Sequence, residues 1–323
     1  MKRCLSLLLA LLLCAALVPA LADATPNPIP VLSEDEITPT PKGIHHYMLI
    51  CLDSWAADIH NPGHTDGLIL VTVDEYARRV MLTSFIRDML IQRPDGKFGR
   101  LNNIVDYFSP AIKGGKDGQK GIEELIKTLN THFNLEIEHY IVVDFQQVQN
   151  IIDAVGGVDI TITDREATYL KNYSISSTST TPSLSGGGTY HFSGHAAVIY
   201  MRIRKVANIE GETQDVGRTR RSRTVLTTIA DSLKNVTYDE AQKLLDVVIE
   251  NTIVTNMSAN DMLDALDLAM ELKGTPVESI RMPIDGTYEP MPVAGMATQQ
   301  IDFVKNREAL WSFFLDSFVV VDE

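Results

Sequence analysis

Short apolar runs bounded by turn residues alternate with longer amphipathic stretches along this chain. The short runs occupy residues 47–52, 68–73, 80–85 and 140–143. Continuous apolar runs of this length are typical of strands that are buried on both faces of a sheet. The first half of the chain therefore predicts the strands of a central β-sheet.

Helical periodicity follows the last of these runs. Residues 145–155 are amphipathic, and after a glycine turn residues 158–163 resemble a further strand, which predicts a strand–helix–strand unit. Four later stretches carry apolar residues at helical spacing, namely residues 225–233, 241–249, 262–272 and 303–314. Ser258 and Asp261 stand at capping-box spacing before the third of them. The whole pattern predicts a three-layer α/β domain.

The first 43 residues differ from this pattern. Residues 1–22 have a cationic start and an apolar run that ends in a small-x-small sequence, which predicts a signal peptide, with an uncleaved N-terminal anchor as the alternative. Residues 23–43 contain five prolines and little apolar pattern, so we expect a Pro-rich linker that takes no part in the core. The folded domain would then occupy residues 44–323, outside the cytoplasmic membrane.

Charge and cysteine content exclude several classes of protein. The chain has 28 basic and 42 acidic side chains, for a net charge of −14, and such a surface repels nucleic acid. Two of the three cysteines lie in the leader, so Cys51 alone would remain, without a partner for an intrachain disulfide. The histidines lack zinc-ligand spacing, and the sequence has no serine-hydrolase elbow.

One segment has a net positive charge, opposite in sign to the net charge of the whole chain. Residues 200–223 hold seven cationic side chains against three acidic ones. Arginine presents a planar fork of donors that suits phosphate oxygens. If residues 201–203 are extended, Arg202 and Arg204 point to one side, and if a helix begins near residue 217, Arg218 and Arg221 share a face. A phosphate site and a solvated or salt-bridged basic face both remain open at this point.

Two aspartates flank the expected strands. Asp53 ends the first strand and Asp66 precedes the second, and carboxylates at neighbouring strand ends can converge on a hard cation such as Mg²⁺. The alternative is that both residues cap turns. Arg87 and Asp88 follow the third strand, where Asp88 either holds Arg87 in place or forms an exposed ion pair of little energetic worth.

Taken in order, these blocks resemble the LytR-CpsA-Psr (LCP) family of cell-wall glycopolymer transferases. The matching segments are residues 49–54, 65–73, 84–88, 100–102, 140–145, 155–159, 192–197, 200–204 and 215–221. Each block alone is weakly specific, but the ordered set covers nearly the whole chain from residue 46 onward.

The resemblance implies a fold and a reaction. The fold would be an α/β/α domain with a central mixed sheet and an apolar cavity that holds a polyprenyl tail. The reaction would move a glycopolymer, such as a teichoic acid, from polyprenyl pyrophosphate to a peptidoglycan hydroxyl. The implied partners are therefore the lipid-linked glycopolymer, peptidoglycan and, through the lipid, the membrane surface at the cell wall of a bacterium.

The resemblance also implies a role for individual residues. Asp53 and Asp66 would be the ligands of Mg²⁺ or Mn²⁺. The catalytic set would be Arg87, Arg202, Arg204, Arg218 and Asp215, with the arginines on the pyrophosphate and Asp215 orienting them or taking part in proton transfer. The substrate-binding residues nearby would be Arg100, Asn102, Arg221 and Asp88. Phosphoryl transfer depends mainly on positioning and charge neutralisation, which such a set supplies.

Three positions depart from the family pattern. Trp55 stands where an arginine is frequent, Ile86 where a proline is usual, and Ser222 where a glutamine is frequent. These changes leave two alternatives to a transferase. One is a relative that binds polyprenyl pyrophosphate or hydrolyses it without attaching polymer. The other is a secreted, non-enzymatic module that binds anionic polysaccharide.

Overall fold

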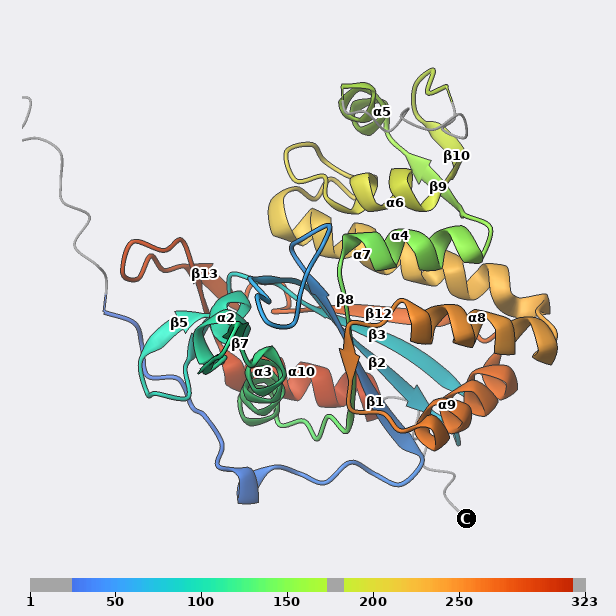
Figure 1. Ribbon diagram of the computed structural model, residues 1–323. Coiled ribbons are helices and arrows are strands. Elements are labelled where there is room, and N and C mark those ends of the chain that lie inside the picture. The colour runs from blue at the N-terminus through green and yellow to red at the C-terminus, as the bar shows by residue number, and fades with distance from the viewer. Residues whose placement is uncertain (1–24, 173–182, 316–323) are drawn as a thin grey trace, which may run out of the picture.

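A computed structural model describes residues 25–172 and 183–315, and a six-stranded mixed sheet forms its centre (Figure 1). The strand order is β11-β8-β1-β2-β3-β12. The strands are β1 (Ile44–Leu52), β2 (Thr65–Asp74), β3 (Arg79–Phe85), β8 (His139–Val143), β11 (Val254–Thr255) and β12 (Val277–Met282). β1, β2 and β3 pair antiparallel in series, whereas β8 lies parallel to β1 and β12 parallel to β3. The predicted strands are thus confirmed, including the mixed character of the sheet.

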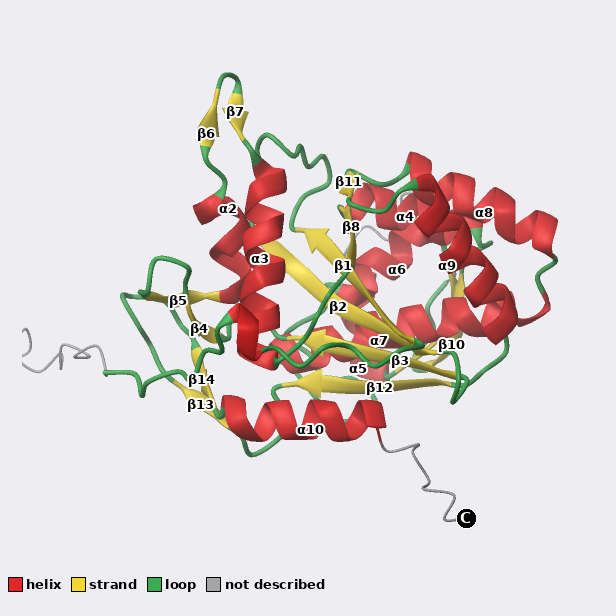
Figure 2. Ribbon diagram, turned by 90° about the horizontal axis from the view of Figure 1, so that it is seen from below, coloured by secondary structure: helices red, strands yellow, loops and turns green. Residues whose placement is uncertain are grey.

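Helices cover both faces of this sheet. In Figure 1 one layer lies below the strands, and in Figure 2 the same layer faces the viewer. It contains α2 (Ile104–Phe108), α3 (Gly118–Phe133) and α10 (Phe303–Leu315). The opposite layer contains α4 (Phe145–Ala154), α6 (Gly194–Met201), α7 (Gln214–Ser232), α8 (Tyr238–Glu250) and, beside α8, α9 (Ala259–Leu272). The three-layer prediction and the four back-third helices are confirmed.

The two faces of β1 have different surroundings. Its burial alternates residue by residue, with Met48, Ile50 and Leu52 fully buried. These side chains belong to the main core, which α3 and α10 complete. Leu49 and Cys51, on the other face, are partly exposed and line a cavity under α4 and α7. The alternation of side chains along a strand therefore separates the packed core from the hollow side of the sheet.

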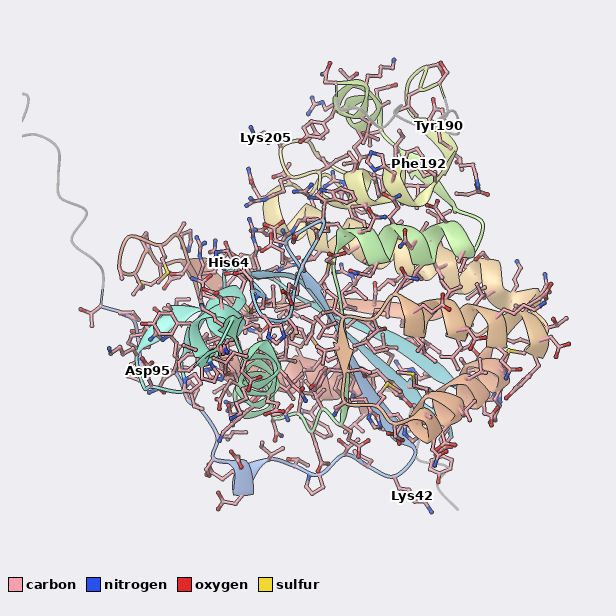
Figure 3. All side chains as sticks on the ribbon, viewed as in Figure 1. Lys42, His64, Asp95, Tyr190, Phe192 and Lys205 are labelled. Atoms are coloured by element: carbon pink, nitrogen blue, oxygen red, sulfur yellow. The ribbon has the colours of Figure 1, made fainter. Side chains whose placement is uncertain are left out.

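A smaller hydrophobic cluster lies beyond α4. The predicted strand–helix–strand unit forms as β8, α4 and β9, but β9 (Val158–Ile162) pairs antiparallel with β10 (Gly188–Phe192) in a sheet of its own and does not join the central sheet. Only alternate residues of β9 are buried, so the strand has one apolar face, which packs with α5 (Asp164–Lys171), α6 and α7. A central strand needs two apolar faces. Figure 3 places Tyr190, Phe192 and Lys205 at this end of the molecule and Lys42, just before β1, at the other.

Shorter elements join these layers. The remaining strands are β4 (Leu90–Gln92), β5 (Phe98–Arg100), β6 (Ala111–Ile112), β7 (Gly115–Lys116), β13 (Tyr288–Pro290) and β14 (Gln299–Ile301), which pair as three hairpins. Within residues 25–172 and 183–315 there are also three 3-10 helices, η1 (Glu34–Glu36), η2 (Leu101–Asn103) and η3 (Leu233–Asn235).

The Pro-rich segment does not stand apart from the domain. Ile29 packs against the main core, the backbone N–H of Leu32 donates to the carbonyl of Thr131 at 3.0 Å, and that of Thr38 donates to the side chain of Asn134 at 2.8 Å. For residues 25–43 the expectation of a tether outside the core is therefore wrong, because composition does not show where a single isoleucine packs. The predicted signal peptide, residues 1–22, lies outside the described residues. Within the described part of the chain, no helix has the length and apolar character to cross a membrane.

Candidate active site

A cavity of about 400 Å³ lies between the sheet and the helices α4, α6, α7 and α8. Most of its wall is apolar. The wall includes Leu49, Ile69, Ile141, Val143, Val148, Ile151, Ile152, Val198, Val225, Leu226, Ile229 and Val248. The charged lining residues are Asp53, Asp66, Arg87, Arg202, Arg204 and Arg218. The cavity therefore joins an apolar interior to a group of ionic side chains, all of which the sequence had predicted as site residues.

The order of the strands explains why these charges meet. β1 ends at Leu52, β2 begins at Thr65 and β3 ends at Phe85, and the three strands pair antiparallel. Asp53, Asp66 and Arg87 therefore emerge at the same end of the sheet. The first turns of α7 bring Arg218 over this end.

Asp66 is the central acceptor of the group. It is 8% exposed, and its Oδ2 accepts from Nη1 of Arg218 at 2.8 Å and from Nη1 of Arg87. Its Oδ1 accepts from Nδ2 of Asn102 at 3.2 Å, and its backbone carbonyl accepts from Nη2 of Arg218 at 2.8 Å. Burial by itself would raise the pKa of Asp66, but Arg218 and Arg87 lower it below its ordinary value. The carboxylate thus stays ionised and holds both guanidinium groups in place.

Asp215 is a second acceptor shared by three arginines. It lies in the first turn of α7 and is 6% exposed. Nε of Arg87 lies 3.4 Å from its carboxylate, Nη2 of Arg204 lies 3.2 Å from it, and Nε of Arg218 lies 3.4 Å from it. Burial lowers the pKa of Arg87, but Asp215 and Asp66 outweigh that effect and raise it. This geometry agrees with the predicted role of Asp215 in orienting arginines.

Arg202 and Arg204 are the outer cations of the group, with side chains 43% and 41% exposed. Arg202 lies 3.8 Å from Asp53, and its guanidinium stands 4.4 Å above the centre of the Phe145 ring. Arg204 has a buried Nε without a hydrogen-bond partner among the described residues. The condition considered for residues 201–203, an extended segment, is not met, because α6 continues to Met201 and Arg202 keeps helical backbone angles. Both arginines nevertheless line the cavity.

The acidic residues provide oxygen ligands for a hard cation, but few of them. Among the described residues, no three histidine, cysteine, aspartate or glutamate side chains form a metal-binding group. Asp53 is 38% exposed at the cavity, and Asn102 beside Asp66 has a buried Oδ1 without a partner in the described structure. Two carboxylates with such a neighbour suit a Mg²⁺ ion that keeps water and takes phosphate oxygens.

None of the four predicted substrate-binding residues lines the cavity. Arg221 is fully buried and binds Glu166 at 2.7 Å, and it also donates to the carbonyls of Ile203 and Val206 at 2.8 and 2.9 Å. Arg100 donates through two nitrogens to the carbonyl of Ala297. The structure thus separates these two arginines from the cationic group and gives Arg221 a positioning role.

Asp88 has a buried side chain outside the cavity lining. Its backbone carbonyl accepts from the N–H of Gln299 at 2.9 Å, while its Oδ1 is buried without a partner among the described residues. Burial and, next, the charge of Asp215 raise the pKa of Asp88. Asn102, the fourth predicted substrate-binding residue, does reach the site through Asp66.

Sequence reasoning missed several residues of this region. Phe145 carries Arg202 on its ring, and Glu166 balances the charge of Arg221. Neither has a local signal for this role, since Phe145 begins an ordinary amphipathic helix and Glu166 stands in the capping box of α5. Cys51 also lines the cavity, where burial raises the pKa of its thiol to about 12 and leaves it protonated.

The fold and the site define an α/β protein with an apolar cavity that ends in an arginine–aspartate group. Residues 42–309 match the LytR_cpsA_psr family, and the chain belongs to that family.

Relatives with named activities share part of their length with this chain. The polyisoprenyl-teichoic acid–peptidoglycan teichoic acid transferase TagV of Bacillus subtilis is 26% identical over 212 residues, which cover 62% of this chain and 47% of TagV. The corresponding TagU of Bacillus licheniformis is 24% identical over 203 residues, covering 62% of this chain and 57% of TagU. The chain thus spans about half the length of these relatives.

Solved structures confirm the fold. TagT bound to LIIa-WTA superposes with a TM-score of 0.64 at 19% identity, over 90% of this chain and 97% of TagT. The LytR-CPS2A-psr family protein YwtF (TagT) with bound octaprenyl pyrophosphate lipid gives a TM-score of 0.61 at 16% identity, over 92% of this chain and all of that one. The structure therefore has the α/β/α architecture of these proteins.

Proposed function

We propose that the chain is a phosphotransferase that moves a glycopolymer from polyprenyl pyrophosphate to a peptidoglycan hydroxyl, assisted by Mg²⁺. The observation that carries the proposal is the apolar cavity that ends at four arginines and two aspartates. A polyprenyl pyrophosphate has the same two parts, a long apolar tail and a doubly charged head. The named activities of TagU and TagV and the lipid bound by TagT agree with this ligand.

The arginines have donors to spare for phosphate oxygens. Arg87 and Arg218 are held by Asp66 and Asp215, so their forks are oriented before any ligand arrives. Arg202 and Arg204 are the more exposed pair and stand nearer to solvent. Oriented cations stabilise the charge that develops on the oxygens of a phosphoryl group in transfer, at little cost in reorganisation.

The reaction proceeds by exchange of one P–O bond for another. The acceptor hydroxyl oxygen attacks the phosphorus that bears the glycopolymer, and the bridging P–O bond to the polyprenyl phosphate breaks. Arg87, Arg202, Arg204 and Arg218 hold the oxygens of both phosphates during this exchange. The hydroxyl proton leaves to water at the Asp53 side of the cavity, where the aspartate side chain is 38% exposed, against 7% for the side chain of Asp66.

A divalent cation would be held by Asp53 and Asp66 and would supply further charge neutralisation on the pyrophosphate. We propose Mg²⁺, or Mn²⁺ in its place. The lipid-linked donor places the reaction at the outer surface of the cytoplasmic membrane, next to peptidoglycan, as the predicted signal peptide also requires.

The deciding experiment incubates the purified protein with a lipid-linked glycopolymer, with and without peptidoglycan oligomers. Polymer that becomes attached to the oligomers supports transfer. Free polymer alone, in both reactions, would contradict transfer and indicate a pyrophosphatase. Binding of polymer without any turnover would indicate the polysaccharide-binding module.

Asp53→Ala tests the metal. We expect turnover to become insensitive to added Mg²⁺ and to fall on the order of 10²-fold, as when one charge-stabilising contact is lost. Asp58→Ala, in the same β1–β2 loop, is a matched control because Asp58 does not line the cavity. Unchanged Mg²⁺ dependence in Asp53→Ala would exclude that residue as a ligand.

A further inference from the structure

Trp55 forms an aromatic group at the edge of the cationic site. It lies two residues after Asp53, in the loop between β1 and β2. Its ring stands 5.5 Å from that of Phe145, edge to face, and 5.7 Å from the imidazole of His195. Trp55 is partly exposed, and its indole N–H has no acceptor among residues 25–172 and 183–315. A partly exposed tryptophan with an unused donor is suited to contact a ligand.

From the interior of the cavity outward, the residues of the site follow an order that ends at Trp55. The apolar wall comes first, and the well-buried Arg87 and Arg218 follow, with side chains 17% and 10% exposed. Arg202 comes next, on the ring of Phe145, with a side chain 43% exposed. Trp55 contacts the same ring of Phe145, so only one ring separates the indole from the outermost guanidinium.

A glycosylated polyprenyl pyrophosphate has its parts in the same order, namely tail, two phosphates and first sugar. The first pyranose is bonded to the second phosphate, so it must lie within about one ring's width of the cations that hold that phosphate. Pyranose rings present C–H groups on their faces, which pack on aromatic rings, and hydroxyl groups at their edges, which accept from donors such as an indole N–H.

We propose that Trp55 is the stacking surface for the first pyranose of the lipid-linked donor. This inference rests on the proposed function and adds a determinant of specificity to it. Because the indole is neutral, its ring packs on the sugar and adds no charge to the site that binds the pyrophosphate. The protein then distinguishes a glycosylated donor from the sugar-free polyprenyl phosphates and pyrophosphates around it.

The test compares two ligands that differ only by the sugar. One is octaprenyl pyrophosphate, and the other is the same lipid bearing a single N-acetylglucosamine on its terminal phosphate. The dissociation constants of both are measured at a fixed Mg²⁺ concentration for the full chain and for Trp55→Ala. We expect Trp55→Ala to bind the glycosylated lipid about ten-fold more weakly, the loss of one good aromatic contact, and the sugar-free lipid as the unchanged chain does.

Two further variants make the comparison specific. Trp55→Phe keeps an aromatic face and should stay within about three-fold of the unchanged chain for the glycosylated lipid. Tyr76→Ala removes an exposed tyrosine at the opposite end of the sheet, in the β2–β3 turn, and should change neither constant. Thermal unfolding of each variant shows that the fold is kept.

The outcomes separate this inference from the proposed function. An equal loss for both ligands in Trp55→Ala would overturn the sugar contact and show that Trp55 acts by positioning Phe145 and Arg202. No loss for either ligand would also overturn it. Failure of the unchanged chain to bind sugar-free octaprenyl pyrophosphate would instead overturn the proposed function, and this inference with it.

Discussion

Two aspartates of the predicted site, Asp66 and Asp88, have opposite electrostatic surroundings. Asp66 accepts from Arg87 and Arg218, and these cations lower its pKa in spite of burial. Asp88 has a buried Oδ1 without a partner in the described structure, and burial raises its pKa, helped by the charge of Asp215. One carboxylate is therefore stabilised as an anion, while the other is stabilised as an acid.

Asp88 gives a prediction with a definite sign. The pKa of Asp88 is higher in the folded chain than its value near 3.8 in the unfolded chain. At a pH between these two pKa values, the folded state therefore binds more protons than the unfolded state. The free energy of unfolding then falls as the pH rises through this window. Asp88→Asn has no such proton. We expect this variant to show a smaller fall in melting temperature from pH 4 to pH 7 and a higher melting temperature than the unchanged chain at pH 7.

Thermal unfolding followed by circular dichroism across this pH range measures the difference. Asp58→Asn, in the β1–β2 loop, is the control, and its curve should run parallel to that of the unchanged chain. A melting temperature of Asp88→Asn that lies below the unchanged chain at pH 7 would show that the ionised carboxylate stabilises the fold, contrary to this argument.

At the scale of elements, the loop that joins α6 to α7 carries Arg202 and Arg204 and has little regular structure. Arg221 donates to two of its carbonyls, those of Ile203 and Val206, and Glu166 of α5 balances the buried charge. The small cluster of α5, α6 and α7 thus fixes the loop that presents the outer arginines. This cluster contributes to the site by fixing the backbone of the α6–α7 loop.

Breaking one member of this buried pair should affect stability strongly. Glu166→Gln leaves the guanidinium of Arg221 buried without a counter-charge, and such changes lower the free energy of unfolding by about 3–5 kcal/mol. Arg221→Met alone leaves Glu166 uncompensated, with a loss of similar size. We expect the double variant to lose less than the sum of the two, because neither charge is then buried alone. Urea denaturation of the four proteins measures this, and additive losses would contradict a direct pairing.

The sequence predicts elements well where local chemistry decides them. The capping box at Ser258 and Asp261 forms as expected, with reciprocal hydrogen bonds at the start of α9. The fate of β9 could not be predicted, because a short alternating run suits a separate hairpin and a sheet edge equally. The role of Arg221 could not be predicted either, because its partner Glu166 lies 55 positions earlier in the chain and no local sequence pattern connects the two residues.

At the scale of the whole molecule, the sequence could reveal the charged part of the site because those residues lie at the ends of β1, β2 and β3. Asp53, Asp66 and Arg87 follow or precede apolar runs, so antiparallel pairing alone brings them together. The cavity itself has no such signal. Leu49 lines the cavity and Met48 is fully buried in the core, yet both are ordinary residues of one apolar run. Hydrophobicity shows that a residue avoids water, but it does not show whether protein or a ligand covers it.

The cavity can therefore be tested by filling it. Val248 of α8 lines the cavity, whereas its neighbour Ile249 is 45% exposed on the outside of the same helix. Val248→Trp should occupy space that a polyprenyl tail needs. At about 0.8 kcal/mol for each carbon removed from an apolar site, exclusion of one five-carbon isoprene unit weakens lipid binding by roughly 4 kcal/mol, or about three orders of magnitude.

Ile249→Trp, which adds the same ring outside, should leave lipid binding unchanged. Inorganic pyrophosphate separates the two parts of the site, because it has a head and no tail, and both variants should bind it as the unchanged chain does. Equal lipid affinity in Val248→Trp and Ile249→Trp would mean that the tail lies elsewhere. A loss of pyrophosphate binding in Val248→Trp would mean that the ring disturbs the arginines, which line the same cavity. Only a loss confined to the lipid shows that the tail occupies the space under α7 and α8.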